Sequence, residues 1–293
     1  MHTMLHIRPV AEKDASPNVL AVYEDIKHTF NIHFVPLLFQ YIAGFEEYFL
    51  YSWGKIKTNL LSDYYRKAVA EIVDRSQASI AHIYKESKTM QAFIATVGSA
   101  EKQTIQQTVV ELQTLNAQLL LLAIALREGV KGVTVGEQFL PRETAAYEET
   151  IFDQFINQQI MHHNLKAQDA QVVPAARMLA PLFGGSSLVV SRYPEFFAHI
   201  AQEVQEVTKT EGYLAERVAM EQFTMQQALH MPYPLGCSYA EIAQFAGKKP
   251  YFAELLYILS ETFPTSFPKL VFATALMQKT LMSHQGIVAV SVA

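Results

Sequence analysis

The sequence lacks the features that mark secreted, redox-active and membrane-spanning proteins. Its single cysteine, Cys237, cannot form an internal disulfide, and no CxxC pair is present to bind zinc or exchange thiols. The longest apolar run, Leu119–Leu126, is far shorter than the roughly 20 residues that cross a bilayer. The N-terminus has no basic stretch followed by an apolar run, so no secretory signal is expected. We therefore expect a cytoplasmic protein that has no membrane partner.

Positive charge and the common catalytic signatures are also scarce. The chain has 23 Lys and Arg against 28 Asp and Glu, a net charge of −5, so nucleic acid is not an expected partner. No GxGxxG, GxxxxGK[ST], HExxH or GxSxG sequence occurs. No cofactor and no metal is therefore expected. Hydrophobic residues make up 50% of the 293 residues, which is ample for a substantial core.

The second half of the chain repeats the first half. Four segments recur in the same order, each between 148 and 151 residues further along. Two similar units are expected to pack as an intramolecular pseudo-dimer, with a ligand site in the channel between them. The pairs are 45–49 with 193–197, 64–70 with 213–219, 81–83 with 229–231, and 116–126 with 267–276.

Local signals predict helices nearly everywhere, so the fold class is all-α. Ser16-Pro17 is a helix start, Ser62 or Asp63 is another, and residues 100–126 are expected to form one long helix. The prolines Pro264 and Pro268 are expected to bound the last helix.

The division between the two units is expected in a glycine-rich segment. Gly129, Gly132, Gly136 and Pro141 predict a linker over residues 128–142. The predicted repeats are accordingly residues 1–135 and 136–293.

Several residues are candidates for chemistry, each with a structural alternative. Asn116 lies in a helix that becomes wholly apolar three residues later, so its amide must bond either to the protein or to a ligand. The pair Gly184-Gly185 before Ser186-Ser187 suits a phosphate or nucleophile loop, but it equally suits an ordinary helix start. His82 and His230 occupy matching repeat positions and are expected to be hydrogen-bonded core residues. Four aromatic residues would form either core or a pocket wall: Phe34, Phe39, Tyr41 and Phe45.

Over its whole length the chain resembles the group I 2-haloacid dehalogenases, the halocarboxylic acid dehalogenase family. The shared features are residues 22–26, the break before Phe34-Val35, Phe45 with Tyr48, Asn116 leading into 119–126, and the duplication itself. The resemblance implies an all-helical pseudo-dimer with its active site in the channel between repeats. It also implies hydrolysis of 2-haloacids by direct attack of water on C2, without an ester intermediate.

The resemblance further implies roles for particular residues. Asn116 matches the asparagine that holds water or substrate, and Phe34 and Leu37 match pocket walls. Leu119 stands where the family has a tyrosine. Ser186, followed by Ser187, stands seven residues before Tyr193-Pro194, where the family has its aspartate base.

The missing aspartate leaves three hypotheses open. Because a serine hydroxyl cannot take a proton from water at pH 7, activity would need another base or Ser186 as a nucleophile. Alternatively, the chain is a catalytically silent binding protein for a small carboxylic acid or apolar ligand, or a helical scaffold without a site. The pocket residues of the first two hypotheses are Phe34, Leu37, Leu119, Gly185 and Ser187, beside Asn116 and Ser186. A homodimer is compatible with any of them.

Overall fold

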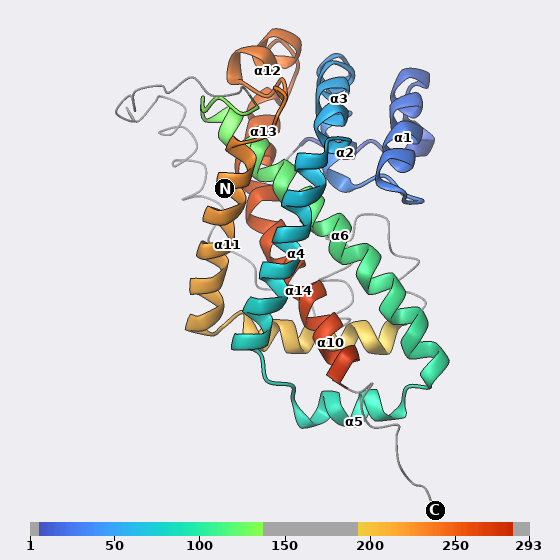
Figure 1. Ribbon diagram of the computed structural model, residues 1–293. Coiled ribbons are helices and arrows are strands. Elements are labelled where there is room, and N and C mark those ends of the chain that lie inside the picture. The colour runs from blue at the N-terminus through green and yellow to red at the C-terminus, as the bar shows by residue number, and fades with distance from the viewer. Residues whose placement is uncertain (1–5, 137–192, 284–293) are drawn as a thin grey trace, which may run out of the picture.

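The structure is a computed structural model that describes residues 6–136 and 193–283, and these ranges are helical without strands (Figure 1), so the all-α prediction is confirmed. The first half begins with a short 3-10 helix, η1 (Glu12–Asp14). Its α-helices are α1 (Pro17–Phe30), α2 (Leu37–Ile42), α3 (Glu46–Leu60), α4 (Asp63–Ile83), α5 (Lys88–Thr96) and α6 (Ser99–Val130). The described part of the second half contains α10 (Pro194–Val207), α11 (Glu211–Leu229), α12 (Tyr239–Ala246), α13 (Phe252–Tyr257), the π-helix η2 (Ile258–Thr262) and α14 (Phe263–Ser283).

The predicted helix starts are present with their caps. The Ser16 hydroxyl accepts a hydrogen bond from the backbone N–H of Val19, and Pro17 takes the first helical position of α1. Ser62 caps α4 in the same way, accepting from the N–H of Tyr65. These local signals fixed both boundaries because a cap satisfies backbone donors that the helix itself leaves unpaired.

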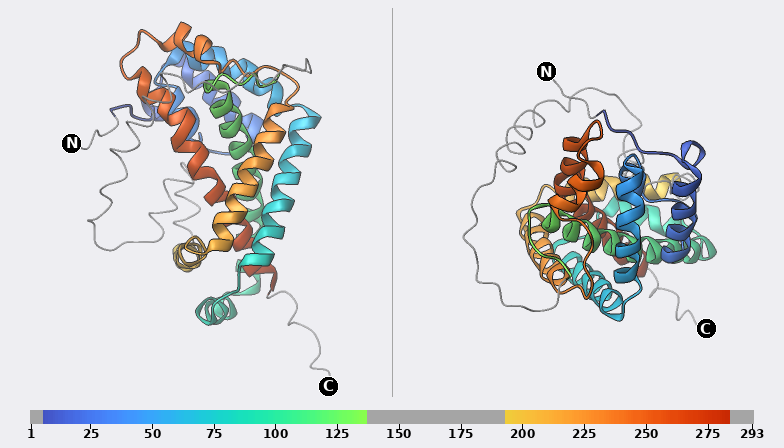
Figure 2. Two further views of the ribbon diagram at one scale, coloured as in Figure 1. Left: turned by 90° about the vertical axis from the view of Figure 1, so that its left-hand side faces the viewer. Right: turned by 90° about the horizontal axis from the view of Figure 1, so that it is seen from above.

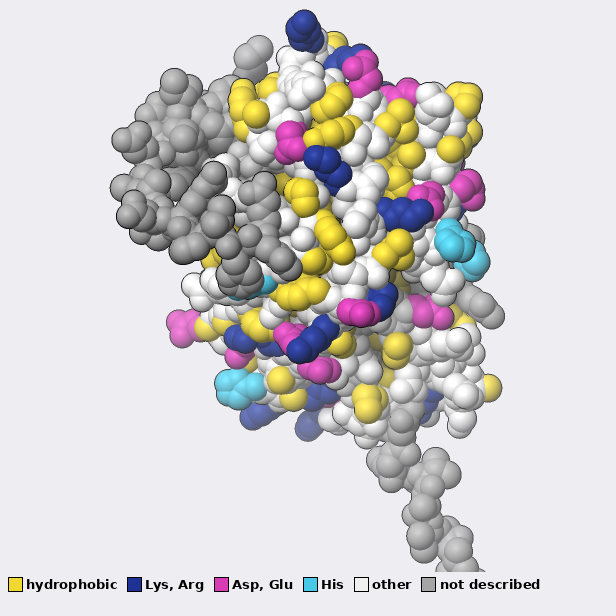
Figure 3. Space-filling model, turned by 45° about the horizontal axis from the view of Figure 1, so that its top comes forward, with side chains coloured by type: hydrophobic (Ala, Val, Ile, Leu, Met, Phe, Trp, Pro, Cys, Tyr) yellow, Lys and Arg dark blue, Asp and Glu magenta, His cyan; other side chains and the backbone are white. Residues whose placement is uncertain are grey.

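The core of the protein is built around α6. By length and composition this helix could cross a membrane, but 78% of its most apolar window is buried inside the protein. It packs against α14, α11 and α4, and Figure 2 shows these four helices as one bundle. On the face shown in Figure 3, the hydrophobic side chains are interspersed with charged ones.

The two halves contact each other reciprocally. Helix α4 of the first half packs on α14 of the second, while α11 of the second half packs on α6 of the first. Polar contacts join α4 and α11: the Tyr64 hydroxyl donates to the carbonyl of Gln227 at 2.9 Å, and the Ser79 hydroxyl donates to the Glu216 carboxylate at 2.7 Å. At one end of the bundle α3 lies beside α12, and at the other end α5 lies beside α10 (Figure 1).

The predicted start of the linker was wrong at Gly129. This glycine lies inside α6, which continues to Val130. A Cβ atom at this position would lie 2.2 Å from Cys237 Sγ, so glycine serves close packing and does not end the helix.

The expected roles of Pro264 and Pro268 were also wrong, because neither residue bounds the last helix. Helix α13, η2 and α14 form one continuous helical stretch, and both prolines lie within α14. Proline lacks an N–H and crowds the carbonyl four residues earlier, so an α-helical ladder cannot run unchanged through Pro264. The helix has a π-turn immediately before Pro264, in which the Phe263 N–H donates to the carbonyl of Ile258, five residues earlier.

Candidate functional site

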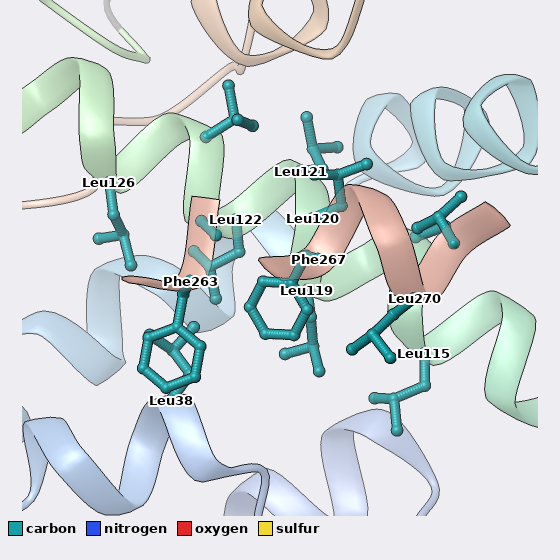
Figure 4. Packing of buried hydrophobic residues seen from close by; sticks show 14 of the residues in the cluster. Leu38, Leu115, Leu119, Leu120, Leu121, Leu122, Leu126, Phe263, Phe267 and Leu270 are labelled. Atoms are coloured by element: carbon teal, nitrogen blue, oxygen red, sulfur yellow. The ribbon is translucent and has the colours of Figure 1, made fainter. Parts of the chain in front are cut away.

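A cavity of about 190 Å³ lies where α6 and α14 cross, next to the segment that enters α2. Figure 4 shows Leu115 and Leu119 of α6 close to Phe267 and Leu270 of α14, and all four residues line the cavity. The described lining residues are Phe34, Pro36, Leu37, Tyr41, Leu112, Leu115, Asn116, Leu119, Thr262, Phe263, Ser266, Phe267 and Leu270. Most of this wall is apolar, as is typical of pockets for small molecules.

The residues that α6 and α14 contribute to this cavity correspond one to one. Four positions of α6 and four of α14 line it, and each pair is separated by 151 residues. In this numbering Asn116 of α6 corresponds to Phe267 of α14, so the one amide that α6 contributes to the lining has an aromatic counterpart. The pairs are Leu112 with Phe263, Leu115 with Ser266, Asn116 with Phe267, and Leu119 with Leu270.

Asn116 is the most informative polar residue of the cavity. Its side chain is 2% exposed, and its Nδ2 atom has no hydrogen-bond partner among the described residues. A buried amide without a partner costs about 1–3 kcal/mol, so proteins seldom retain one without a use for it. The Nδ2 group carries two N–H donors, and therefore suits a ligand atom that accepts hydrogen bonds, such as a carboxylate oxygen.

The other polar groups of the cavity are hydroxyls. Thr262 and Ser266 lie one helical turn apart, and the Ser266 hydroxyl donates to the Thr262 carbonyl at 2.6 Å. Apart from the Tyr41 phenol, no described residue of the lining is titratable. Glu261 adjoins Thr262 in sequence but is not part of the lining; burial raises the pKa of its carboxyl, although Lys131 and Arg127 counteract this.

The structure brings four of the sequence-predicted residues to this one cavity: Phe34, Leu37, Asn116 and Leu119. Of the expected aromatic wall, Tyr41 also lines it, whereas Phe39 and Phe45 are buried in the core. The predicted residues Gly185, Ser186 and Ser187 lie outside the described residues.

The contribution of α14 was missed. Thr262, Phe263, Ser266 and Phe267 were not predicted from sequence, although the expected repeat contains a signal for them. Paired positions on the two apolar helices are separated by 151 residues. Adding 151 to the positions of Leu112, Leu115 and Asn116 gives Phe263, Ser266 and Phe267, three of these four residues.

The expectation for the two repeat-related histidines was wrong. The His82 side chain is 81% exposed, and His230 is also exposed, bonding through Nδ1 to the Gln226 carbonyl at 2.7 Å. Both lie at the C-terminal end of a helix, where a polar side chain reaches solvent and interacts favourably with the helix dipole. No group of three His, Cys, Asp or Glu residues that could hold a metal occurs in ranges 6–136 and 193–283.

Comparison with known proteins finds a similar family and several similar solved structures. Residues 33–141 match the family described as Halocarboxylic acid dehydrogenase DehI. A mutant D-2-haloacid dehalogenase has a similar structure, with a TM-score of 0.72 and 18% identity over 94% of this chain and 96% of that one. Two further similar structures, with the same coverage, are a complex of a mutant D-2-haloacid dehalogenase with D-2-CPA (TM-score 0.70, 17% identity) and a complex of D-2-haloacid dehalogenase with L-LA (0.72, 18%). No curated protein matches the chain in sequence.

The resemblance to the halocarboxylic acid dehalogenase family is therefore confirmed. The matched residues 33–141 include Phe34, Leu37, Asn116 and Leu119, and the chain as a whole has the fold of the D-2-haloacid dehalogenases.

Proposed function

We propose that this protein hydrolyses small 2-halocarboxylic acids in the cavity between α6 and α14. A water oxygen attacks C2, the carbon–halogen bond breaks, and the products are a 2-hydroxy acid, a halide ion and a proton. The observation that carries the proposal is Asn116, a buried amide donor without a described partner in an otherwise apolar cavity. The similarity to D-2-haloacid dehalogenases supports the choice of substrate.

The described residues would bind and orient the substrate. Asn116 Nδ2 donates to the carboxylate or to the attacking water, and Phe34 and Leu37 exclude bulk water from C2. A hydrogen bond is electrostatically stronger in such surroundings than in water, because the local dielectric constant is lower. The cavity therefore favours an oriented acid over a freely rotating one.

No described lining residue is a base, so the proton of the attacking water would pass to solvent, and Ser186, at the position of the family's aspartate, is assigned only the orientation of that water. A neutral hydroxyl can orient the attacking water but cannot accept its proton at pH 7. Because a positioned base contributes about 10²–10⁴ in rate, turnover should be slow. Replacing Ser186 by Asp should accelerate halide release by a factor of that order.

The test is halide release from D- and L-2-chloropropionate by the wild-type protein and by two variants, Ser186→Ala and Ser186→Asp. The proposal expects slow release by the wild type, less by Ser186→Ala and more by Ser186→Asp. Release by the wild type that does not exceed the Ser186→Ala background would refute hydrolysis by the natural protein.

A second candidate function is binding without turnover. It is favoured by the absence of any carboxylate, histidine or lysine from the described lining of the cavity. In that case short carboxylic acids should raise the melting temperature of the protein while no halide is released. Activity that appears only in Ser186→Asp would assign the natural chain to this second function.

A further inference from the structure

One wall of the cavity is a continuous row of aromatic rings. Tyr41 meets Phe263 edge to face, with ring centroids 6.0 Å apart and an interplanar angle of 64°. Phe263 stacks in turn on Phe267, at 5.5 Å and 21°. All three residues line the cavity, so the face of this row that borders the cavity can contact a further ring. Aromatic rings prefer such offset-stacked or edge-to-face partners.

The size of the cavity also matches a ring. A cavity of about 150 Å³ lined by Leu, Ile and Phe takes up benzene in another protein, and this cavity measures about 190 Å³. A methyl group, the C2 substituent of 2-chloropropionate, would fill less of that volume than a ring does. The lining also includes three leucines of α6, namely Leu112, Leu115 and Leu119.

The distribution of polarity orients such a ligand. No described lining residue carries a charge, and among these lining residues Asn116 Nδ2 is the buried donor without a described partner. A ligand that suits this surface has a hydrogen-bond acceptor at one end and an uncharged, flat apolar group at the other.

We infer that this cavity selects carboxylic acids that carry an aryl group at C2, with the carboxylate at Asn116 and a phenyl-sized ring against Phe263 and Phe267. The inference rests on the proposed function for the acid and for C2 as the reacting carbon. Recognition of the ring can be measured without any reaction. For a halogenated substrate the balance of atoms is the one given above: water adds its oxygen to C2, and halide and a proton leave.

Three unreactive acids test the inference by isothermal titration calorimetry on the full chain. They are phenylacetate, cyclohexylacetate and propionate, which carry at C2 a flat ring, a saturated ring of similar size and a methyl group. Phenylacetate should bind at least about 10-fold more tightly than propionate, because the ring buries more apolar surface. It should also bind about 2- to 10-fold more tightly than cyclohexylacetate, because only an aromatic ring stacks. Equal binding of phenylacetate and either other acid, or no binding of phenylacetate, would overturn the inference.

Variants then locate the ring. Phe267→Leu should weaken the binding of phenylacetate and leave the affinity for cyclohexylacetate nearly unchanged. Phe49→Leu removes a buried ring outside the cavity lining and should change neither affinity, since Phe49 meets Tyr23 edge to face instead. Leu119→Phe fills the cavity and should weaken the binding of phenylacetate more than that of propionate. This variant provides a second test if Phe267→Leu does not fold. Unchanged phenylacetate affinity in a folded Leu119→Phe variant counts against the inference.

Halide release separates this inference from the proposed function. Tight phenylacetate binding without halide release from 2-chloro-2-phenylacetate or 2-chloropropionate would refute hydrolysis and keep the aryl specificity. Halide release from 2-chloropropionate without phenylacetate binding would refute the aryl specificity and keep hydrolysis.

Discussion

Two buried asparagines, Asn116 and Asn59, differ in whether their amides are paired. Asn59 Nδ2 donates to the Tyr233 carbonyl at 2.8 Å, and Asn59 Oδ1 accepts from the Tyr233 N–H at 3.2 Å. Asn116 Nδ2 has no such partner among the described residues. We expect Asn116→Leu to stabilise the protein by about 1 kcal/mol or leave it unchanged, and to abolish ligand binding.

Asn59→Leu is the matched control for that variant. It removes both bonds to Tyr233 and should destabilise the protein by about 1–3 kcal/mol. Urea unfolding measures both free energies, and calorimetric titration measures binding. A destabilisation of Asn116→Leu as large as that of Asn59→Leu would show that the amide of Asn116 has a structural role.

Gly129 and Gly54 provide a second comparison between single residues in helices. Alanine is favoured over glycine by about 1 kcal/mol in a helix interior, and at Gly54 nothing lies within 4 Å of an added Cβ. Gly54→Ala should therefore stabilise the protein. Gly129→Ala should destabilise it by more than about 1 kcal/mol, because the Cβ would overlap Cys237 Sγ. Equal shifts in melting temperature, measured by circular dichroism, would contradict the close approach.

The start of α12 is tied to α3 through one carboxylate, that of Glu241. Glu241 completes a capping box with Ser238, and it accepts from the Tyr51 hydroxyl at 2.6 Å and the Lys55 ammonium at 3.1 Å. Burial alone would raise the pKa of Glu241, but the hydrogen bonds from Tyr51, Ser238 and Lys55 lower it from 4.5 to about 2.

This carboxylate should therefore stabilise the fold in a pH-dependent manner. A lowered folded-state pKa gives stabilisation that is full above the unfolded value of 4.5 and is lost as the pH falls towards 2. Glu241→Gln should lower the melting temperature at pH 7, and the difference from wild type should shrink between pH 4.5 and 2. The exposed pair Glu47–Lys249 supplies the control, since Glu47→Gln should change the melting temperature little at any pH. A constant difference across this pH range would show that the ionised form is not what stabilises α12.

At the level of helices, the sequence predicted what short-range chemistry determines. The caps at Ser16 and Ser62 were predictable because the capping bond lies within three residues of the cap. The continuation of the helix through Pro264 was not predictable from sequence. Packing against α6 favours a continuous helix here, and a π-turn accommodates the proline, which has no N–H to donate. Asn116 could be singled out because it precedes an apolar run in its own helix, whereas Leu119 was expected only from the family resemblance, and Phe263 and Phe267 depend on which helix crosses α6.

For the whole molecule, we propose that the two halves are repeats related by an approximate two-fold axis through the cavity. The constant separation of 151 residues between paired lining positions supports this, as does the reciprocal packing of α4 on α14 and α11 on α6. An isologous contact has this pattern, in which each unit presents the same surface to the other.

Neither half should then fold alone. Residues 1–135 would expose the apolar surface of α6 that α14 and α11 cover, and are expected to show helical circular dichroism without a cooperative unfolding transition. Coexpression with residues 136–293 should restore the transition and phenylacetate binding. A cooperative, monomeric 1–135 fragment would contradict the pseudo-dimer.

The close approach of Cys237 to Gly129 makes the only thiol of the chain a natural reporter of separation between the halves. The side chain is 3% exposed, and burial raises the pKa of its thiol to about 12, so the native protein should react with Ellman's reagent extremely slowly. The reagent can reach the thiol only when the segment that bears Cys237 moves away from α6. The labelling rate therefore measures how often this opening occurs, and no probe has to be introduced. A ligand that bridges α6 and α14 should slow this reaction in proportion to its occupancy, even if the ligand is never turned over.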